Sequence, residues 1–195
     1  VGCGCQNIFY DEQVDGGLTM AYATDEGRLT QLPQNVEAER AFLGGLILDN
    51  RQIDAMLDYL PSSVVREALN PPSVKKRGAA FLANEPLFSL QANQAVFAAV
   101  MTLHEKSAGI DLTTLAEELE RRGLLEMVGG PAYLASLEED LFSLGQMSQY
   151  AQIIVEKWRL RNLIRTSQKI ISQATVSDAQ ADAILEGAER QIFEI

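Results

Sequence analysis

Apolar residues begin to recur at helical spacing after Pro33. Asn35 is a suitable N-cap residue, and the negative charges of Glu37 and Glu39 favour the positive end of a helix dipole. The pair Asp49-Asn50 is expected to end this first helix. Its apolar positions lie largely on one face: Ala41, Phe42, Gly45, Leu46 and Leu48.

Two adjacent glycines, Gly44 and Gly45, occupy the middle of this helix. A glycine inside a helix costs about 1 kcal/mol relative to alanine. We therefore expect another helix to approach the first one closely at this pair.

The pattern next predicts a short helix over Gln52–Leu60 that ends at Pro61. Residues 70–86 contain three prolines and a glycine and are expected to form a loop. This loop carries the basic triplet 75–77, which we interpret as solvated, with nucleic-acid contact as the alternative. Another helix is predicted over Gln91–Lys106, with Val96, Phe97, Val100 and Leu103 on its apolar stripe.

A further helix is expected to begin at Asp111, which is placed as an N-cap between the staple residues Ile110 and Leu115. Gly123 is the expected left-handed stop of this helix. Gly129-Gly130-Pro131 then predicts a turn and the start of the next helix. The buried stripe of the helix after Asp111 is predicted to be Leu112, Leu115, Ala116 and Leu119.

Paired charges follow that stripe. Glu117 with Arg121, and Glu118 with Arg122, have the spacing of surface ion pairs, each contributing about 0.2–0.5 kcal/mol. Neighbouring glutamates, as at 117–118 and 138–139, point about 100° apart on a helix and do not converge on a substrate. We interpret these charges as structural rather than catalytic, and His104 as a packed side chain near a helix end.

A long helix, about 39 Å in length, is predicted over Gln149–Ala174. Ser177 and Gln180 form a capping-box pattern that starts a last helix. The long helix carries a wide apolar face at Tyr150, Ile153, Ile154, Trp158, Leu160, Leu163, Ile164, Ile170 and Ile171. The last helix has its own face at Ile184, Leu185, Ala188, Ile192 and Ile195.

These two helices are expected to form an antiparallel hairpin with more apolar surface than it can bury alone, which predicts self-association. The polar side of the long helix carries a basic stripe of Lys157, Arg159, Arg161, Arg165 and Lys169.

Composition limits the partners of the chain. Its 195 residues fit one domain, or one domain with an appendage, and 16 basic against 27 acidic residues give a net charge of −11. Such a surface repels duplex DNA, so we expect protein partners. Residues 1–32 are expected to form a weakly ordered arm with a short strand at NIFY (7–10) or LTMAYA (18–23). The absence of a long apolar run or a signal sequence in the sequence given predicts a cytoplasmic location, without a membrane.

No catalytic, cofactor-binding or metal-binding residues are predicted. The sequence contains no G-x-x-x-x-G-K-[ST], HExxH or GxSxG motif. The only cysteines, Cys3 and Cys5, lie about a hundred residues from the only histidine, too few ligands for a structural metal site.

Four segments, taken in order, carry a family resemblance: PQNVEAERAFLGGLILDN (33–50), QAVFAAVMTLHEKSAGIDLTTLAEELERRGLLEMVGGPAYLASL (94–137), QYAQIIVEKWRLRNLIRTSQKII (149–171) and ILEGAERQIFEI (184–195). Together they resemble the N-terminal domain of bacterial DnaB-family replicative DNA helicases. The resemblance implies an all-α fold with a compact helical head, residues 33–145, and a long antiparallel hairpin, residues 146–195. Residues 1–32 have no counterpart, residues 61–86 look like an inserted loop with Leu87-Phe88 as a remnant of the family's turn, and the linker and RecA-like motor are expected beyond the hairpin.

The family resemblance also implies partners. Six such domains form a collar, often a trimer of dimers, above an ATPase ring that encircles single-stranded DNA and uses ATP and Mg²⁺. The collar recruits a DnaG-type primase, and a helicase loader engages the enzyme during assembly. Met147, Tyr150 and Ile153 match the family segment for subunit packing; burial within the domain would select the same residue types. We expect interface residues at Met147, Tyr150, Ile153, Leu160, Ile164 and Ile192.

Three alternatives remain at this stage. TTLAEELERRG resembles a short recognition unit, which would make the chain a winged-helix-like DNA-binding protein, although the segment is net acidic. A stand-alone replication accessory protein would share the resemblance without a motor. A helical-bundle enzyme would need inward-facing carboxylates or histidines in i, i+3 sets, and the sequence has no such sets.

Overall fold

The first helix begins where its cap predicts. The Asn35 side chain accepts a hydrogen bond from the backbone N–H of Ala38 at 3.0 Å, and α1 runs from Val36 to Leu48. The computed structural model describes residues 9–11, 19–23, 29–69, 85–139, 144–176, 180–193 and 195. The other elements of the head and hairpin are η1 (Asn50–Gln52), α2 (Ile53–Leu57), α3 (Ser62–Leu69), α5 (Gln91–Glu105), α6 (Leu112–Arg121), α7 (Leu125–Val128), α8 (Gly130–Glu139), η3 (Leu144–Gln146), α9 (Met147–Val176) and α10 (Ala181–Phe193).

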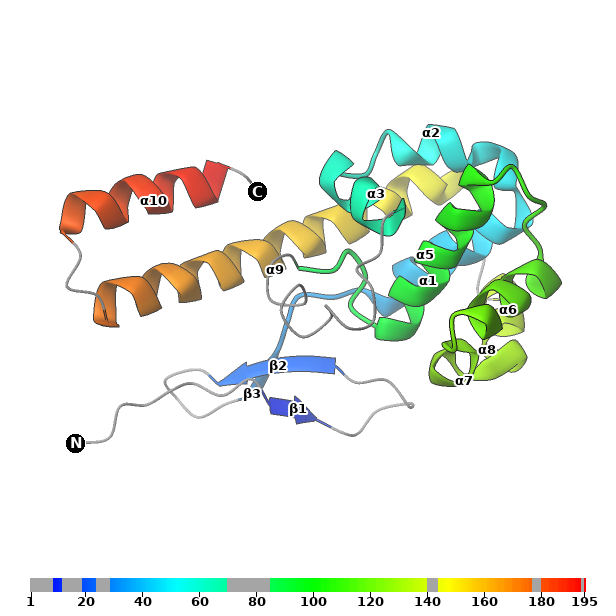
Figure 1. Cartoon of the computed structure of the whole chain (residues 1–195), viewed down its shortest axis with the longest axis horizontal. Helices are drawn as coiled ribbons and strands as arrows, with labels where there is room; N and C mark the ends of the chain where they lie inside the picture. Colours follow the sequence, from blue (N-terminus) through cyan, green and yellow to red (C-terminus); the bar gives the residue numbers. More distant parts are fainter. Residues whose placement is uncertain are drawn as a thin grey trace.

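A small antiparallel sheet precedes the helices (Figure 1). Its strands are β1 (Phe9–Asp11), β2 (Thr19–Ala23) and β3 (Leu29–Gln31), paired in the order β1-β2-β3. β1 and β2 fall on the two segments where short strands are predicted, and β3 is an addition. From Val36 onward the described chain is all-helical, which confirms the predicted fold class.

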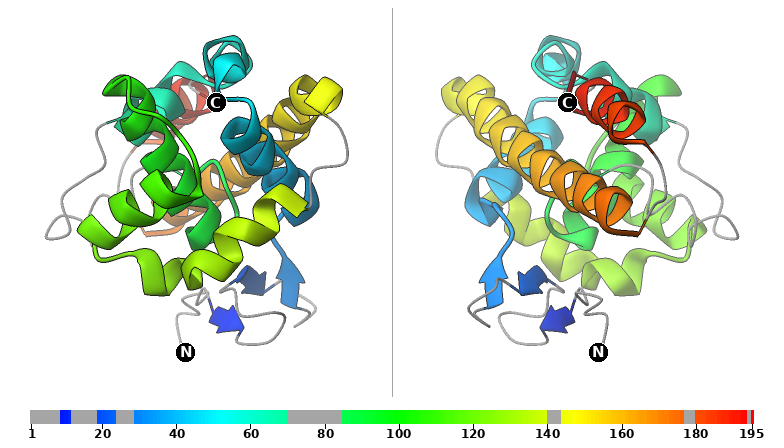
Figure 2. Two further views of the ribbon diagram at one scale, coloured as in Figure 1. Left: turned by 90° about the vertical axis from the view of Figure 1, so that its right-hand side faces the viewer. Right: turned by 90° about the vertical axis from the view of Figure 1, so that its left-hand side faces the viewer.

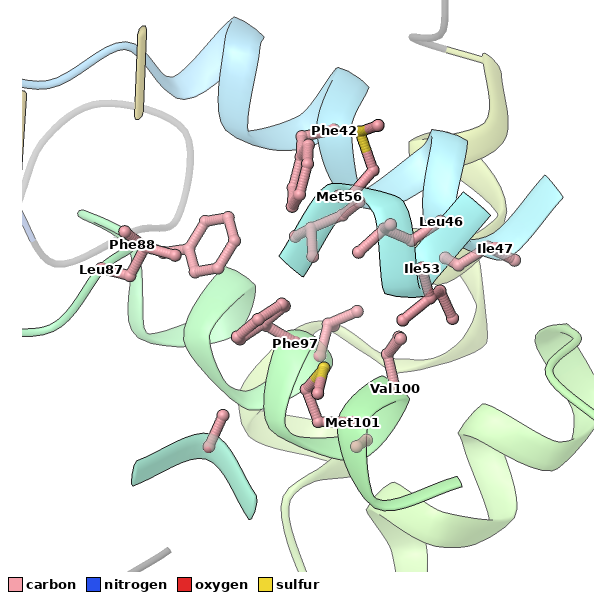
Figure 3. Close-up of a cluster of buried hydrophobic side chains, with 14 of the residues drawn as sticks. Phe42, Leu46, Ile47, Ile53, Met56, Leu87, Phe88, Phe97, Val100 and Met101 are labelled. Atoms are coloured by element: carbon pink, nitrogen blue, oxygen red, sulfur yellow. The ribbon is translucent and has the colours of Figure 1, made fainter. Parts of the chain in front are cut away.

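The core of the head is built around α1, which packs against α5, α8 and α9. Phe88 lies between two other rings, with its centroid 6.4 Å from that of Phe42 and 5.2 Å from that of Phe97. Figure 3 shows these rings with aliphatic side chains from α1, α2 and α5. Leu87 and Phe88 are fully buried, so this short turn is an anchor of the core.

We predicted an inserted loop over residues 61–86. This prediction is wrong for the start of that range, because Ser62–Leu69 form helix α3. Val64 and Ala68 are buried in the core beside α5. Pro61 opens this helix: its carbonyl accepts the backbone N–H groups of Val64 and Val65. Proline has no N–H and loses nothing in the first helical turn, so it can start a helix as well as end one. Residues 70–84, with the basic triplet, lie outside the described part of the chain.

The preceding helix is shorter than predicted. α2 ends at Leu57 rather than Leu60, because Tyr59 and Leu60 donate to carbonyls three residues back and tighten the chain into a turn.

The hairpin has the predicted form. α9 is longer than expected at both ends, and α10 runs back along its distal half (Figures 1 and 2). The predicted cap residue Ser177 lies outside the described residues. At the base of the hairpin, α9 crosses α1 at Gly45, where an added Cβ would meet the Met147 sulfur at 2.0 Å. The close helix approach predicted at the glycine pair is confirmed.

Candidate association surface on the helical hairpin

The last helix lies on α9 without burying any of its side chains. Leu185, Ile192 and Phe193 are 60%, 50% and 95% exposed. A helix held only by partial contacts gains little from burial, since each square ångström of apolar surface contributes about 25 cal/mol only when it leaves water. The outer face of the hairpin therefore leaves apolar side chains exposed to solvent.

An open apolar groove runs between the two helices near the C-terminal end of α10. On α9, Leu160 and Leu163 are 39% and 44% exposed. Exposed leucines in adjacent turns, with Ile192 of α10 and Ile195 just beyond it, form the kind of contiguous apolar patch that marks a protein interface. The groove is lined by Glu156, Arg159, Leu160, Leu163, Ile192 and Ile195.

Charge differs between the two helices of the hairpin. α9 carries the cations Lys157, Arg159 and Lys169, and α10 carries the anions Asp182, Glu186 and Glu189. Among the residues that the structure describes, no ion pair joins α9 to α10; the charge pair of α10 is internal, Glu186 to Arg190 at 3.8 Å. α9 and α10 thus carry opposite net charge, with Glu156 on α9 and Arg190 on α10 as the exceptions.

The six predicted interface residues divide into two groups. Met147 is buried in the head, and Tyr150 and Ile153 pack partly against the same core. Leu160 and Ile192 meet in the groove. Ile164, on the distal half of α9, is half-buried. Of these six residues, Leu160 and Ile192 on the distal hairpin are exposed, and Met147 serves the core of its own domain.

Phe193 and Leu163 were not among the predicted interface residues. Leu163 was assigned to the wide apolar face of α9, and Phe193 was left off the apolar stripe of α10. Leu185 and Ile192 belong to that stripe and are also at least half exposed, so the stripe itself does not mark which positions face outward.

The basic stripe predicted on α9 is interrupted. Arg161 is 2% exposed, and Arg165 donates to the Glu85 carboxylate at 2.9 Å. Burial lowers the pKa of the Arg161 guanidinium, and the carboxylates of Glu85 and Glu39 offset part of this effect. These two arginines therefore face the head rather than solvent.

One charge of α6, Glu118, is also turned inward. Glu118, predicted as a surface residue, has 5% of its side chain exposed and pairs with Arg121 at 2.6 Å and Arg122 at 2.8 Å. Arg122 also donates to Thr102 at 2.6 Å and to the Ala98 carbonyl at 3.3 Å, which ties α6 to α5. Arg122 is thus engaged inside the head, whereas a recognition helix needs its arginines on the surface.

Burial alone would raise the pKa of Glu118, but hydrogen bonds from Arg121 and Arg122 outweigh it and lower the pKa to about 2. His104 lies 2.8 Å from Asp54, in keeping with a structural role. Across the described ranges, no group of three His, Cys, Asp or Glu side chains is arranged to hold a metal ion.

A helical head followed by a two-helix hairpin defines an all-helical domain. Residues 62–156 match the family model of the DnaB-like helicase N-terminal domain. The chain is 35% identical over 144 residues to the replicative DNA helicase DnaB of Buchnera aphidicola, covering 74% of this chain and 26% of that protein. The chain belongs to the DnaB-like helicase N-terminal domain family.

Solved structures agree with this assignment. The crystal structure of the N-terminal domain of DnaB helicase from Mycobacterium tuberculosis matches with a TM-score of 0.68 and 26% identity, over 85% of this chain and 100% of that one. A DnaB-like replicative helicase, described with its interactions with primase, shares the fold with a TM-score of 0.57 and 21% identity, over 83% of this chain and 31% of that one.

The chain spans about a quarter to a third of the length of the curated relatives that it matches. None of the helices described here has the length and apolar character needed to cross a membrane.

Proposed function

We propose that this chain is the collar domain of a replicative DNA helicase and that it associates with copies of itself through the distal hairpin. The observation that carries the proposal is α10, a helix of 13 residues with no buried side chain. Its exposed apolar residues and the groove beside them become buried when two hairpins pack together. Family membership supports a dimer, and a trimer of dimers when the collar forms a hexamer.

The whole protein, in this proposal, unwinds duplex DNA with ATP and Mg²⁺ bound to a motor domain and encircles single-stranded DNA. The collar docks a DnaG-type primase and engages a loader during assembly. The primase interaction described for a helicase of the same fold supports this part of the proposal. A cytoplasmic location follows from the assignment, because replication takes place there in bacteria.

Self-association is tested by sedimentation velocity of the whole chain over a range of concentrations. Leu160→Glu and Ile192→Glu each place a charge in the groove, so we expect the association constant to fall at least tenfold. Met127→Glu is the matched control, since Met127 is an apolar residue 45% exposed on the head. A wild-type chain that stays monomeric at high concentration would argue against the hairpin as the association surface.

Primase docking is tested by isothermal titration calorimetry, in which a DnaG-type primase is titrated into the chain. The primase comes from a bacterium with a related helicase. We expect saturable binding that does not require DNA. Strong, salt-dependent binding of duplex DNA by the chain, without primase binding, would instead favour a DNA-binding module.

A further inference from the structure

Arg161 lies in the middle of α9, with 1% of its side chain exposed. A buried guanidinium is costly unless each of its donors is used. Here the two terminal nitrogens donate to the carbonyl oxygens of Pro33 at 2.8 Å, Pro86 at 2.9 Å and Leu87 at 2.6 Å. The Nε atom lies 3.3 Å from the Glu85 carboxylate as an ion pair without a hydrogen bond.

Two neighbours on the same face of α9 hold the same segment. The indole N–H of Trp158 donates to the backbone carbonyl of Glu85 at 2.9 Å, and Arg165 donates to its carboxylate at 2.9 Å. Positions 158, 161 and 165 follow the spacing of one helix face. We name these three residues and Glu85 the arginine clasp.

Going toward the C-terminus of α9, the arginine clasp is the last buried contact between the long helix and the head. Beyond Arg161, no residue of α9 that the structure describes is buried. The helix continues from there to Val176, about 22 Å. Figure 1 shows this distal part carrying only α10. The clasp therefore sits at the base of the part that bears the association surface.

The clasp and the groove lie on opposite sides of α9. At about 100° per residue, the clasp positions point about 180° away from Arg159, Leu160 and Leu163. Rotation of α9 about its own axis would move the groove by the same angle. A planar guanidinium with several fixed acceptors permits one rotation, whereas apolar side chains can slide past one another.

We propose that Arg161, acting through Glu85 and the three carbonyls, is the positioning residue that turns the groove of the hairpin toward a second copy of the chain. This inference rests on the proposed self-association. Arg161 does not touch the partner: it fixes the rotation of α9, and the groove makes the contact.

The test uses the whole chain with Cys3 and Cys5 changed to serine and nitroxide labels at Glu120→Cys in the head and Ser172→Cys on the distal hairpin. Both labelled positions are exposed. Pulsed electron paramagnetic resonance, with labelled chain diluted into unlabelled chain, gives the head-to-hairpin distance. Arg161→Lys keeps the positive charge but loses the planar guanidinium with its several hydrogen-bond donors. Glu85→Gln is the milder variant, used if Arg161→Lys does not fold. Arg51→Lys, with 87% of the Arg51 side chain exposed, is the matched control.

We expect the clasp variants to keep their helical circular dichroism. They should broaden or shift the distance distribution and weaken self-association at least fivefold. Arg51→Lys should change neither the distance distribution nor the self-association. An unchanged distance distribution in a folded clasp variant would overturn the proposal. So would a changed distribution with unchanged association. A monomeric wild-type chain would refute the self-association alone, since the distance measurement still reports whether the clasp orients the hairpin.

Discussion

A Cβ atom added to Gly44 would lie 2.0 Å from the carbonyl oxygen of Leu137. The position of a Cβ is fixed by the backbone of α1, and the carbonyl belongs to the backbone of α8, so no change of rotamer can relieve the overlap. The helices are packed backbone to backbone at this point. The contact explains why a residue that weakens a helix occupies the middle of the most buried one.

Gly44→Ala is therefore expected to destabilise the chain by about 1–3 kcal/mol, because α8 must move to admit the methyl group. Urea unfolding followed by circular dichroism measures the change. Gly187→Ala is the control: the nearest atom to its added Cβ is 3.9 Å away, so the alanine should stabilise α10 by up to about 1 kcal/mol. Equal stability of Gly44→Ala and wild type would contradict the close approach.

Loss of the cap at the start of α1 is expected to cost about 1 kcal/mol in Asn35→Ala. The amide oxygen that accepts the N–H of Ala38 disappears, and this donor is left without its partner. Asn35→Ser keeps a capping oxygen and should retain most of the stability. The same unfolding assay compares the two variants, and equal losses in both would show that the hydrogen bond is not what stabilises the helix end.

Glu118 should make the chain sensitive to acid. Its pKa in the folded chain is about 2, below its usual value of 4.5, so the ionised group stabilises the fold above pH 4.5. This contribution is lost as the pH falls from 4.5 through 2. We estimate it at about 1–2 kcal/mol, less than the pKa difference alone implies, because the exposed partner Arg121 is screened by water.

Glu118→Gln removes this titration. At pH 7 the variant should unfold at lower urea than wild type, and the difference should shrink steadily as the pH falls below 4.5. A difference that stays constant between pH 7 and pH 3 would mean that the carboxylate charge does not contribute. Glu117→Gln, on the exposed side of α6, should show no such dependence.

Two apolar residues of α9 should separate folding from association. Met147→Ala removes a buried side chain and is expected to cost about 2–5 kcal/mol of stability. Leu160→Ala, at a position 39% exposed, should change the stability of the monomer by less than about 0.5 kcal/mol. Sedimentation should then show weaker association for Leu160→Ala and unchanged association for Met147→Ala under conditions where it is folded. The reverse result would move the association surface to the base of the hairpin.

The helices themselves could be predicted because their signals are local. Asn35 and Asp111 cap N–H groups two or three residues away, and Gly123 takes the left-handed conformation expected of a helix stop. These interactions depend only on the order of neighbouring residues. The same holds for the apolar stripes, whose spacing repeats with the helix turn.

The prediction was wrong where a partner lies far away in the chain. Glu118 was assigned to the surface because its partner arginines are near in sequence. Arg122, however, also donates a hydrogen bond to Thr102 in α5 and so ties this pair to a distant helix. The helix Ser62–Leu69 was missed because it is short and follows Pro61, although Val64, Val65, Ala68 and Leu69 repeat at helical spacing.

By itself the sequence determined the helical class, the head-and-hairpin order and the excess of apolar surface on the hairpin, because helix periodicity and capping act over a few residues. Only the tertiary structure decided which apolar and charged positions face outward. Met147 and Leu160 have the same character in the sequence, yet one packs against Gly45 and the other lines the groove. In the sequence Arg161 belongs to a basic stripe, but in the folded protein it pairs with Glu85, which is far away in the chain. Solvent exposure depends on such distant contacts, and no local pattern encodes them.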